Sequence, residues 1–264
     1  SGTMSGAAGG TVLDPEPGLF SNVAVFDFRS LYPSIIRTFN IDPLAYERSN
    51  AESDCITAPN GARFSRQQAI LPLLIQDYFA SRRKALDTGD ENAAYVYKIL
   101  MNSFYGVLGS GTCRYGRTEL AGAITSFARS WLYASRDWFV SQGYTVLYGD
   151  TDSLFIESAL DDDACFHDFY ERCSSLAASV NLLLSDRIRY EYGVESRLEL
   201  RFEKVYRRFL IPPLRSSGSS SARGRAKGYG GYLLGEDDSL QVEVKGMEAV
   251  RSDSTALARR FQLE

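Results

Sequence analysis

The sequence predicts an α+β fold, and three patterns along its 264 residues indicate this class. Strand and helix patterns are mixed, without the regular βαβ alternation of a parallel sheet. Residues 69–86 and 91–108 carry apolar side chains at helical spacing and are separated by a short turn, as in an antiparallel helical hairpin. Residues 144–147 and 153–157 are predicted to be the two strands of a β-hairpin.

The first strand pattern ends close to an acidic residue. Residues 22–28 are mostly apolar and β-branched or aromatic, so we expect a strand that carries Asp27 near its end. Ser30 can cap a following helix, and Pro33 suits the first helical turn. Asp27 is therefore expected at a strand-to-helix junction, and residues 40–68 are expected to form an irregular connection.

The second half of the chain contains further regular elements. They are expected in this order: a long amphipathic helix (119–142), the β-hairpin, a helix from a cap at 161–163 to about residue 187, strands over 197–212 and 228–250, and a serine-rich loop (216–222) between those strands.

Composition indicates a soluble globular protein in the cytoplasm. Hydrophobic residues make up 44% and charged residues 23%, and no apolar run approaches the roughly 20 residues of a membrane span. The N-terminus has neither the charged start nor the apolar stretch of a signal peptide; residues 1–10 are expected to be disordered or left from cloning. The four cysteines form no CxxC pair, so free thiols are expected instead of a zinc site or a disulfide framework.

The net charge is −4, but the charges are segregated along the chain. Residues 201–227 contain eight basic residues and one acid, whereas residues 150–171 contain eight acids and no lysine or arginine. Such segregation fits a site with metal on one side and a polyanion on the other. Ordinary solvated faces are the alternative interpretation.

Two groups of carboxylates stand where strand patterns stop. Asp27 ends the first, and Asp150 and Asp152 lie at the tip of the hairpin. Mg²⁺ prefers oxygen ligands, often one or two carboxylates together with substrate phosphates. A pair of such ions can activate an attacking hydroxyl and stabilise a leaving oxygen. The alternative is that these aspartates are only turn residues, but two like charges aimed at one edge are costly without a cation.

One predicted helix carries polar side chains along a single face. Lys98, Asn102 and Tyr105 are spaced i, i+4, i+7, so a cation, an amide and an aromatic ring stand in a row. Such a row can meet a triphosphate and then a base, although a solvated polar stripe has the same spacing. The neighbouring helix of the hairpin carries three consecutive basic residues, Arg82, Arg83 and Lys84, which could converge on the same anion.

Three segments together resemble the signature motifs of family B DNA polymerases, in the family's order. They are DFRSLYPSII (27–36), KILMNSFYG (98–106) and YGDTDS (148–153). VKGMEAVRSD (244–253) resembles the family's segment between palm and thumb, and Lys227-Gly-Tyr229 stands where the family has a Lys/Arg-Tyr element. The resemblance runs from about Gly10 to the end and is nearest to bacterial members.

The resemblance implies a polymerase palm, an antiparallel sheet backed by helices, with inserted fingers made of an antiparallel helical hairpin. The implied division is palm over 11–68 and 111–250, fingers over 69–110, and the start of a truncated thumb over 251–264. Exonuclease and N-terminal domains would precede the chain in a larger protein.

The resemblance also assigns roles to individual residues. Asp27 and Asp152 match the metal-binding aspartates, the carbonyl of Phe28 matches a backbone ligand, and Asp150 matches a supporting acid of the catalytic group. The nucleotide contacts are Ser30, Leu31, Tyr32 (the steric gate against a 2′-hydroxyl), Arg82, Lys98, Asn102 and Tyr105. Lys227, Tyr229, Lys245 and Arg251 match positions that face primer-template DNA.

One position departs from the family pattern. The fingers usually carry Arg and, four residues later, Lys, but the residue four after Arg82 is Leu86. Lys84 or Arg83 could take that place.

The implied function is template-directed transfer of a deoxynucleotide from dNTP to a primer 3′-hydroxyl, with two Mg²⁺ ions that Mn²⁺ can replace. The expected partners are primer-template DNA, dNTP and, through regions that this sequence lacks, a sliding clamp; no membrane is expected. A non-catalytic nucleotide- or DNA-binding module, either degenerate or inactive without a thumb, is the alternative. A sugar-phosphate enzyme with the same metal pair is disfavoured, because it would leave the Lys98–Tyr105 face unexplained.

Overall fold

The computed structural model of the chain describes residues 12–13, 15–213 and 227–246. They divide into two compact units. The helical unit comprises Phe28–Ala134 and Asn181–Glu199. The sheet unit comprises the remaining described residues, which come from Thr11–Asp27, Ser135–Val180 and Leu200–Glu264.

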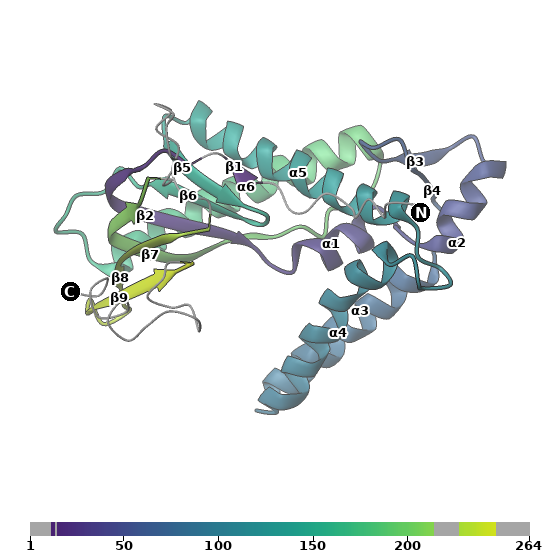
Figure 1. Cartoon of the computed structure of the whole chain (residues 1–264), viewed down its shortest axis with the longest axis horizontal. Helices are drawn as coiled ribbons and strands as arrows, with labels where there is room; N and C mark the ends of the chain where they lie inside the picture. Colours follow the sequence, from purple (N-terminus) through teal and green to yellow (C-terminus); the bar gives the residue numbers. More distant parts are fainter. Residues whose placement is uncertain (1–11, 14, 214–226, 247–264) are drawn as a thin grey trace, which may run out of the picture. The chain divides into compact units, whose positions relative to one another are not determined.

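The sheet unit is built on one seven-stranded sheet, drawn with its strand labels in Figure 1. In spatial order the strands are β1 (Val12–Leu13), β5 (Thr145–Asp150), β6 (Ser153–Glu157), β2 (Gly18–Phe28), β7 (Leu200–Ile211), β8 (Tyr229–Leu234) and β9 (Leu240–Lys245). Neighbouring strands run antiparallel in the pairs β1–β5, β5–β6, β6–β2, β7–β8 and β8–β9. The expected α+β class is confirmed, whereas the strand expected over 228–250 is two strands joined by a turn.

The two faces of this sheet have different partners. Alternate residues of a strand point to opposite faces, so Val25 and Phe26 of β2 face opposite ways. The Phe26 ring lies 4.8 Å from that of Phe139 in α5 (Thr118–Ser141) and 6.2 Å from that of Phe202 in β7. Val25 instead belongs to a separate cluster of buried aromatic and aliphatic side chains. Asp27, two residues after Val25, belongs to this second face.

The helical unit begins with short elements where an irregular connection was expected. After α1 (Leu31–Thr38) come α2 (Pro43–Arg48), the 3-10 turn η1 (Ser49–Ala51) and a small hairpin of β3 (Cys55–Thr57) and β4 (Arg63–Ser65). Asp42 caps α2 by accepting hydrogen bonds from the backbone N–H of Leu44 at 2.6 Å and of Ala45 at 3.3 Å. An Asp cap followed by proline is a helix-start signal that the expectation for 40–68 overlooked.

The predicted helical hairpin is confirmed. Helices α3 (Ile70–Asp87) and α4 (Glu91–Gly109) run side by side in Figure 1 and are joined by a short turn. Asp90 caps α4 by accepting a hydrogen bond of 2.9 Å from the Ala93 N–H. Tyr78 of α3 lies 5.7 Å from Tyr97 and 6.1 Å from Phe104, ring centroid to centroid, so aromatic packing joins the two helices.

Two long helices complete the chain. Helix α5 covers the expected 119–142 closely, whereas α6 (Phe166–Tyr192) starts later and ends later than expected. Asp168 accepts a hydrogen bond of 2.8 Å from the Cys165 N–H at its start. In the helical unit, α5 stacks its Phe127 ring on Phe39 at 3.7 Å. The expected loop at 216–222 lies outside the described residues.

Candidate active site

A polar recess of about 300 Å³ opens on the sheet unit. Its lining residues are Val25, Asp27, Asp150, Thr151, Asp152, Ser153, Phe155, Glu203, Lys204, Lys227, Tyr229 and Lys245. Three of them are the aspartates expected to be catalytic, and three are residues expected to face DNA. The fold therefore brings together two sets of residues that are far apart in the sequence.

Strand register places the first aspartate beside the hairpin tip. Asp27 of β2 pairs with Ser153 of β6, and Ser153 pairs in turn with Asp150 of β5. Asp27 also lies two residues after Val25, so both point to the same face of the sheet. The three strands thus present their acidic ends at one edge of that face.

The hairpin tip is a tight turn between two acids. Thr151 and Asp152 are the only residues between the paired Asp150 and Ser153. Thr151 has φ of 55°, a left-handed conformation that is costly for a β-branched residue. Backbone strain of this kind is concentrated at functional sites.

Asp150 is held by its neighbours. Its Oδ1 accepts a hydrogen bond of 3.1 Å from Thr151 Oγ1 and forms an ion pair of 3.2 Å with Lys227 Nζ. The Tyr148 hydroxyl also hydrogen-bonds this carboxylate, and it accepts the Lys227 N–H at 2.9 Å. Burial, chiefly, raises the pKa of Tyr148 to about 12, so the hydroxyl stays protonated. These contacts suit Asp150 to a supporting role.

Asp152 has a different environment. Within the described part of the chain its side chain makes no ion pair, and its one hydrogen-bonding partner is its own backbone N–H. Burial, and next the negative charge of Asp150, raise its pKa to about 6, although Lys227 acts in the opposite direction. A carboxylate that is difficult to ionise alone gains most from a cation.

The residues of the recess that were expected to face DNA are joined by a close backbone approach. Gly246, beside Lys245, has φ of 60°, and a Cβ there would lie 1.7 Å from the carbonyl oxygen of Lys227. Tyr229 pairs with Lys245 across β8 and β9. Only glycine permits this approach, which keeps Lys227 and Lys245 on the same recess.

Sequence reasoning missed several members of this site. Glu203 and Lys204 of β7 line the recess, and Lys204 Nζ lies 2.8 Å from Glu243 Oε2. Tyr206 hydrogen-bonds the same carboxylate, and Lys245 Nζ lies 3.6 Å from its Oε1. Burial alone would raise the pKa of Glu243, but the bonds from Lys204 and Tyr206 outweigh it and lower that pKa. The mixed charges within the expected strand 197–212 were the available signal.

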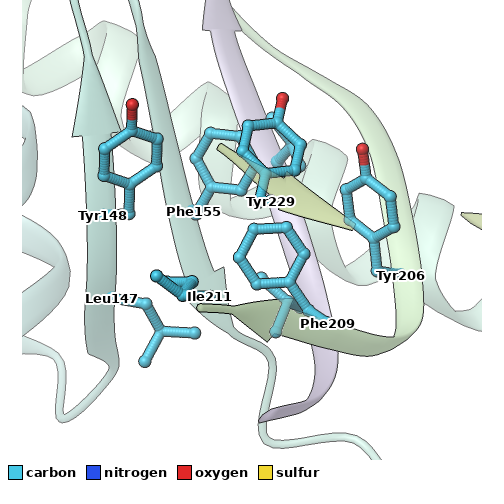
Figure 2. Close-up of a cluster of buried hydrophobic side chains, with 9 residues drawn as sticks. Leu147, Tyr148, Phe155, Tyr206, Phe209, Ile211 and Tyr229 are labelled. Atoms are coloured by element: carbon cyan, nitrogen blue, oxygen red, sulfur yellow. The ribbon is translucent and has the colours of Figure 1, made fainter. Parts of the chain in front are cut away.

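Aromatic side chains pack beside the recess, and two of them, Phe155 and Tyr229, line it. Figure 2 shows Tyr148, Tyr206 and Tyr229 with their hydroxyls pointing the same way, above Leu147 and Phe209. Phe155 lies 5.2 Å from Tyr148 and 5.2 Å from Tyr229, ring centroid to centroid. The cluster therefore buries the apolar rings while it keeps the hydroxyls at the polar end.

The recess does not contain a preformed metal-binding cluster. Among the residues that the structure describes, no group of three or more His, Cys, Asp or Glu side chains is arranged to hold an ion. Mg²⁺ usually takes one or two carboxylates, with water and substrate phosphates supplying the remaining ligands. The Asp152 carboxylate, partly desolvated and unpaired among the described residues, fits that ion.

The expected nucleotide contacts of α1 and α4 lie within the helical unit. The Tyr32 and Tyr105 rings are 4.6 Å apart, and burial raises the pKa of Tyr105. Lys98 and Asn102 are exposed along the same α4 face, as expected. Leu31, the first residue of α1, is buried.

Two further expected nucleotide contacts, Ser30 and Arg82, have unusual local geometry or bonding. Ser30 occupies the N-cap of α1, but it has φ of 49° and makes no capping hydrogen bond through its side chain. Arg82 buries its Nε without a hydrogen-bond partner in the described structure. An unsatisfied guanidinium nitrogen is costly unless a ligand completes it. Arg251 lies outside the described residues.

The segregated charges partly neutralise one another. Arg208, from the basic stretch, forms an ion pair of 2.7 Å with Asp162, from the acidic stretch, and Lys227 pairs with Asp150. Arg207 donates hydrogen bonds to Asn22 and to the Ala164 carbonyl. Pairing within the fold therefore accounts for part of the charge pattern.

Two further features bear on the class of protein. Cys55, Cys113, Cys165 and Cys173 are free thiols, as expected. Among the described residues, no helix combines the length and the apolar character that crossing a membrane requires.

An antiparallel sheet with acids at one edge, together with a helical hairpin, defines a palm-like class of fold. The sequence profile of DNA polymerase family B matches residues 1–262, and the chain belongs to that family. It is 36% identical over 97% of its length to DNA polymerase II of Escherichia coli strain K12, and this match covers 32% of the relative. The expected likeness to bacterial members of the family is thereby confirmed.

Relatives from other organisms match the same region. The chain is 30% identical to a DNA polymerase of Archaeoglobus fulgidus, over 97% of the chain and 30% of the relative. It is 29% identical to DNA polymerase 1 of Pyrococcus abyssi strain GE5, over 96% of the chain and 31% of the relative. The chain thus spans about a third of the length of these relatives.

Proposed function

We propose that this chain is the catalytic palm and fingers of a polymerase that transfers a deoxynucleotide from dNTP to a primer 3′-hydroxyl on a DNA template. Family membership supports the class of reaction. The observation that carries the proposal is the convergence of Asp27, Asp150 and Asp152 on one recess.

The acids of the recess have distinct proposed roles. Asp27, the Phe28 carbonyl and Asp152 would hold two Mg²⁺ ions, for which Mn²⁺ can substitute. When bound, the ions would supply Lewis acidity at the phosphate and the attacking oxygen. Asp150, engaged by Lys227 and Tyr148, would orient the tip of the hairpin. The pairing of Asp27 with Ser153 supports this division.

The helical unit would bind the incoming nucleotide. Lys98, Asn102 and Arg82 would contact the triphosphate, and the orphaned Nε of Arg82 supports an anionic ligand there. Ser30 and Leu31 would lie beneath it. The remaining two contacts, Tyr32 and Tyr105, would form an aromatic pair at the sugar and base, with Tyr32 occupying the space of a 2′-hydroxyl.

The primer-template contacts are proposed at Lys227, Tyr229, Lys245 and Arg251. Lys227 and Lys245 are exposed, and the buried Tyr229 lines the same recess. Lysines increase the affinity for the phosphate backbone of DNA but do not distinguish one base sequence from another. In the proposed division the palm comprises 11–68 and 111–250, the fingers 69–110, and the thumb begins at 251–264.

Primer extension by the intact protein tests the proposal. Asp27→Asn and Asp152→Asn should each lower the incorporation rate by at least about a thousandfold, because the metal ligands act in the transition state. Asp163→Asn removes an exposed carboxylate from a nearby segment and should leave the rate unchanged. Retained metal-dependent extension by either recess variant would overturn the assignment.

The same series separates catalysis from binding alone. A non-catalytic nucleotide- or DNA-binding module would show template binding in every variant and no extension in the unmodified protein. Extension that is present before substitution and lost with Asp152→Asn, with DNA binding retained, supports the polymerase.

A further inference from the structure

The helical unit contains a second basic feature whose residues have no role in the proposed function, although the sequence analysis offered one of them, Arg83, as a substitute contact to the triphosphate. Two recesses, of about 380 and 390 Å³, adjoin because they share Arg37, Gln76 and Arg197. We call the pair the arginine groove. The arginines that line it are Arg29, Arg37, Arg66, Arg83 and Arg197.

Three segments bring these side chains together. Arg37 comes from the last turn of α1, Arg197 from the stretch after α6, and Gln76, Phe79 and Arg83 from α3. The three α3 residues are spaced i, i+3, i+7 and so share one helix face. The backbone N–H of Arg197 donates to Thr38 Oγ1 at 2.9 Å, which fixes that stretch beside α1.

The negative charge in the groove is less than the positive charge. Arg29 pairs with Glu199 at 3.5 Å, Arg197 with Glu195 at 3.2 Å and Arg66 with Asp54 at 2.8 Å. Arg37 and Arg83 have no carboxylate partner among the described residues. The side-chain amides of Gln68 and Gln76 make no hydrogen bond to any described residue either. Two cations and two amides are therefore available to a ligand.

Arg37 is held in position without an anion. Its guanidinium lies 5.0 Å from the centroid of the Phe79 ring. Burial, and next the like charge of Arg197, lower the pKa of Arg37, which indicates that two guanidinium groups face the same partly buried space. A preorganised pair of like charges favours an anionic ligand.

We propose that the arginine groove binds the phosphodiester backbone of a single-stranded nucleic acid segment. The arginines are distributed along two adjoining recesses, which suits a chain of phosphates better than one compact anion. Guanidinium planes can stack on unpaired bases, and Arg37 and Arg83 bring such groups to the lining of this groove. The proposal concerns binding only and does not depend on nucleotidyl transfer.

A concave groove favours a flexible strand over other polyanions. Duplex DNA is a stiff cylinder and meets exposed charges, whereas a single strand can enter a recess and follow it. Acidic protein segments lack the planar bases that a stacked guanidinium can receive. The amides of Gln68 and Gln76 add donors and acceptors of the kind that read base edges.

Salt-dependent binding tests the proposal without catalysis. Anisotropy of a labelled oligothymidylate of about 12 nucleotides would be measured with the chain in EDTA, without dNTP, at several salt concentrations. Arg83→Gln and Arg37→Gln should each weaken binding several-fold and reduce the slope of log K against log salt by about 0.7. Arg136→Gln, which removes an arginine of the sheet unit paired with Asp137, is the matched control.

Each result has a defined reading. Lysines of the sheet unit contribute equally in all variants, so their effect cancels in the comparison. Thermal melting checks that Arg37→Gln, which loses the Phe79 contact, still folds; Arg83 is exposed and gives an independent variant. Unchanged slopes for both groove variants would overturn the proposal, whatever primer extension by the intact protein shows.

Two competing ligands would also overturn it. If an oligoglutamate of equal length binds as tightly and is equally sensitive to Arg83→Gln, the groove accepts an acidic protein segment. If inorganic phosphate at constant ionic strength displaces the oligonucleotide only from proteins with an intact groove, the site holds a single anion. If the groove variants lose affinity for oligothymidylate but not for oligoglutamate, the result supports binding of a single-stranded nucleic acid.

Discussion

Asp150 and Asp152 are two positions apart, but their carboxylates have different electrostatic environments. Asp150 is paired with Lys227 and hydrogen-bonded by Tyr148, while Asp152 is partly buried with no such partner among the described residues. The sequence places both at a hairpin tip, and spacing alone cannot separate their roles. The partners that distinguish them, Tyr148 through its hydroxyl and Lys227 from a distant segment, meet only in the fold.

Asp152→Asn should stabilise the metal-free chain. The folded-state pKa of about 6 lies above the ordinary 3.8, so folding favours the protonated form. The protonated Asp152 side chain contributes fully to folding stability below about pH 4. This contribution is lost as the pH rises through 6, which lowers the free energy of unfolding by about 3 kcal/mol. Urea unfolding in EDTA should therefore show the variant to be more stable at pH 8 and equal to the unmodified chain near pH 4.

Asp163→Asn is the control for that measurement, because Asp163 is exposed. It should leave the pH profile of stability unchanged. Equal stability of Asp152→Asn and the unmodified chain at pH 8 would contradict the predicted cost of the partly buried charge.

At the scale of elements, the site depends on how strand ends meet. Strand β9 brings Lys245 to the recess only because Gly246 approaches the carbonyl of Lys227. In the helical unit, Lys98 and Asn102 of α4 share an exposed face whatever surrounds them. Local spacing predicts the second arrangement and cannot predict the first.

Gly246→Ala should disrupt the closure of β8 and β9. The added Cβ meets the Lys227 oxygen, so that backbone must move and the Lys227–Asp150 ion pair is lost. Gly89→Ala is the control, because Gly89 also has positive φ (74°) but has no atom near the added Cβ. We expect Gly246→Ala to destabilise by about 1–3 kcal/mol more than Gly89→Ala in thermal melts. If both variants lose the same stability, the positive φ of the glycine, and not the contact with the Lys227 oxygen, causes the destabilisation.

Lys98→Ala should weaken nucleotide binding without destabilising the fold. Lys98 is exposed and makes no ion pair or hydrogen bond in the described structure. Its substitution should therefore remove only a contact with bound triphosphate. In the intact protein the KM for dNTP should rise about tenfold or more, as for loss of a charged hydrogen bond.

Lys84→Ala is the matched comparison, an exposed lysine on α3. A smaller effect there would assign the triphosphate contact to α4. An equal effect would show that Lys84 takes the place left by Leu86.

At the scale of the whole molecule, two helices run through both units. The division falls within α5, between Ala134 and Ser135, and within α6, between Val180 and Asn181. A helix interrupted partway loses hydrogen bonds on both sides of the break. The units therefore share continuous secondary structure and should not unfold independently.

The chain's two tryptophans can test this coupling. Trp131 lies in the helical unit and Trp138 in the sheet unit. In Trp138→Phe and Trp131→Phe variants, each remaining tryptophan reports on one unit. In each variant, the denaturation curve from tryptophan fluorescence should coincide with the curve from circular dichroism, which reports on the whole chain. Separate midpoints would contradict the prediction.

Much of this protein could be predicted from its sequence because the relevant signals are local. Apolar spacing indicated the α3–α4 hairpin, and three motifs indicated family and candidate residues. The short elements of 40–68 were missed because each is supported by only a few residues, such as the Asp42 cap. Glu203 and Glu243 were missed because the effect of Glu203 on Asp152 and the ion pair of Glu243 with Lys204 join residues on different strands.

The sequence by itself determined which residue types are available: two acidic strand ends, a polar helix face and scattered arginines. Tertiary structure alone decided which of them meet. It partly buried Asp152 beside Asp150, paired part of the basic stretch with nearby acids, and set Arg37 against Arg197 in a groove. The reason is physical: charge and desolvation depend on distances of a few ångströms, and only the fold sets these between residues far apart in the chain.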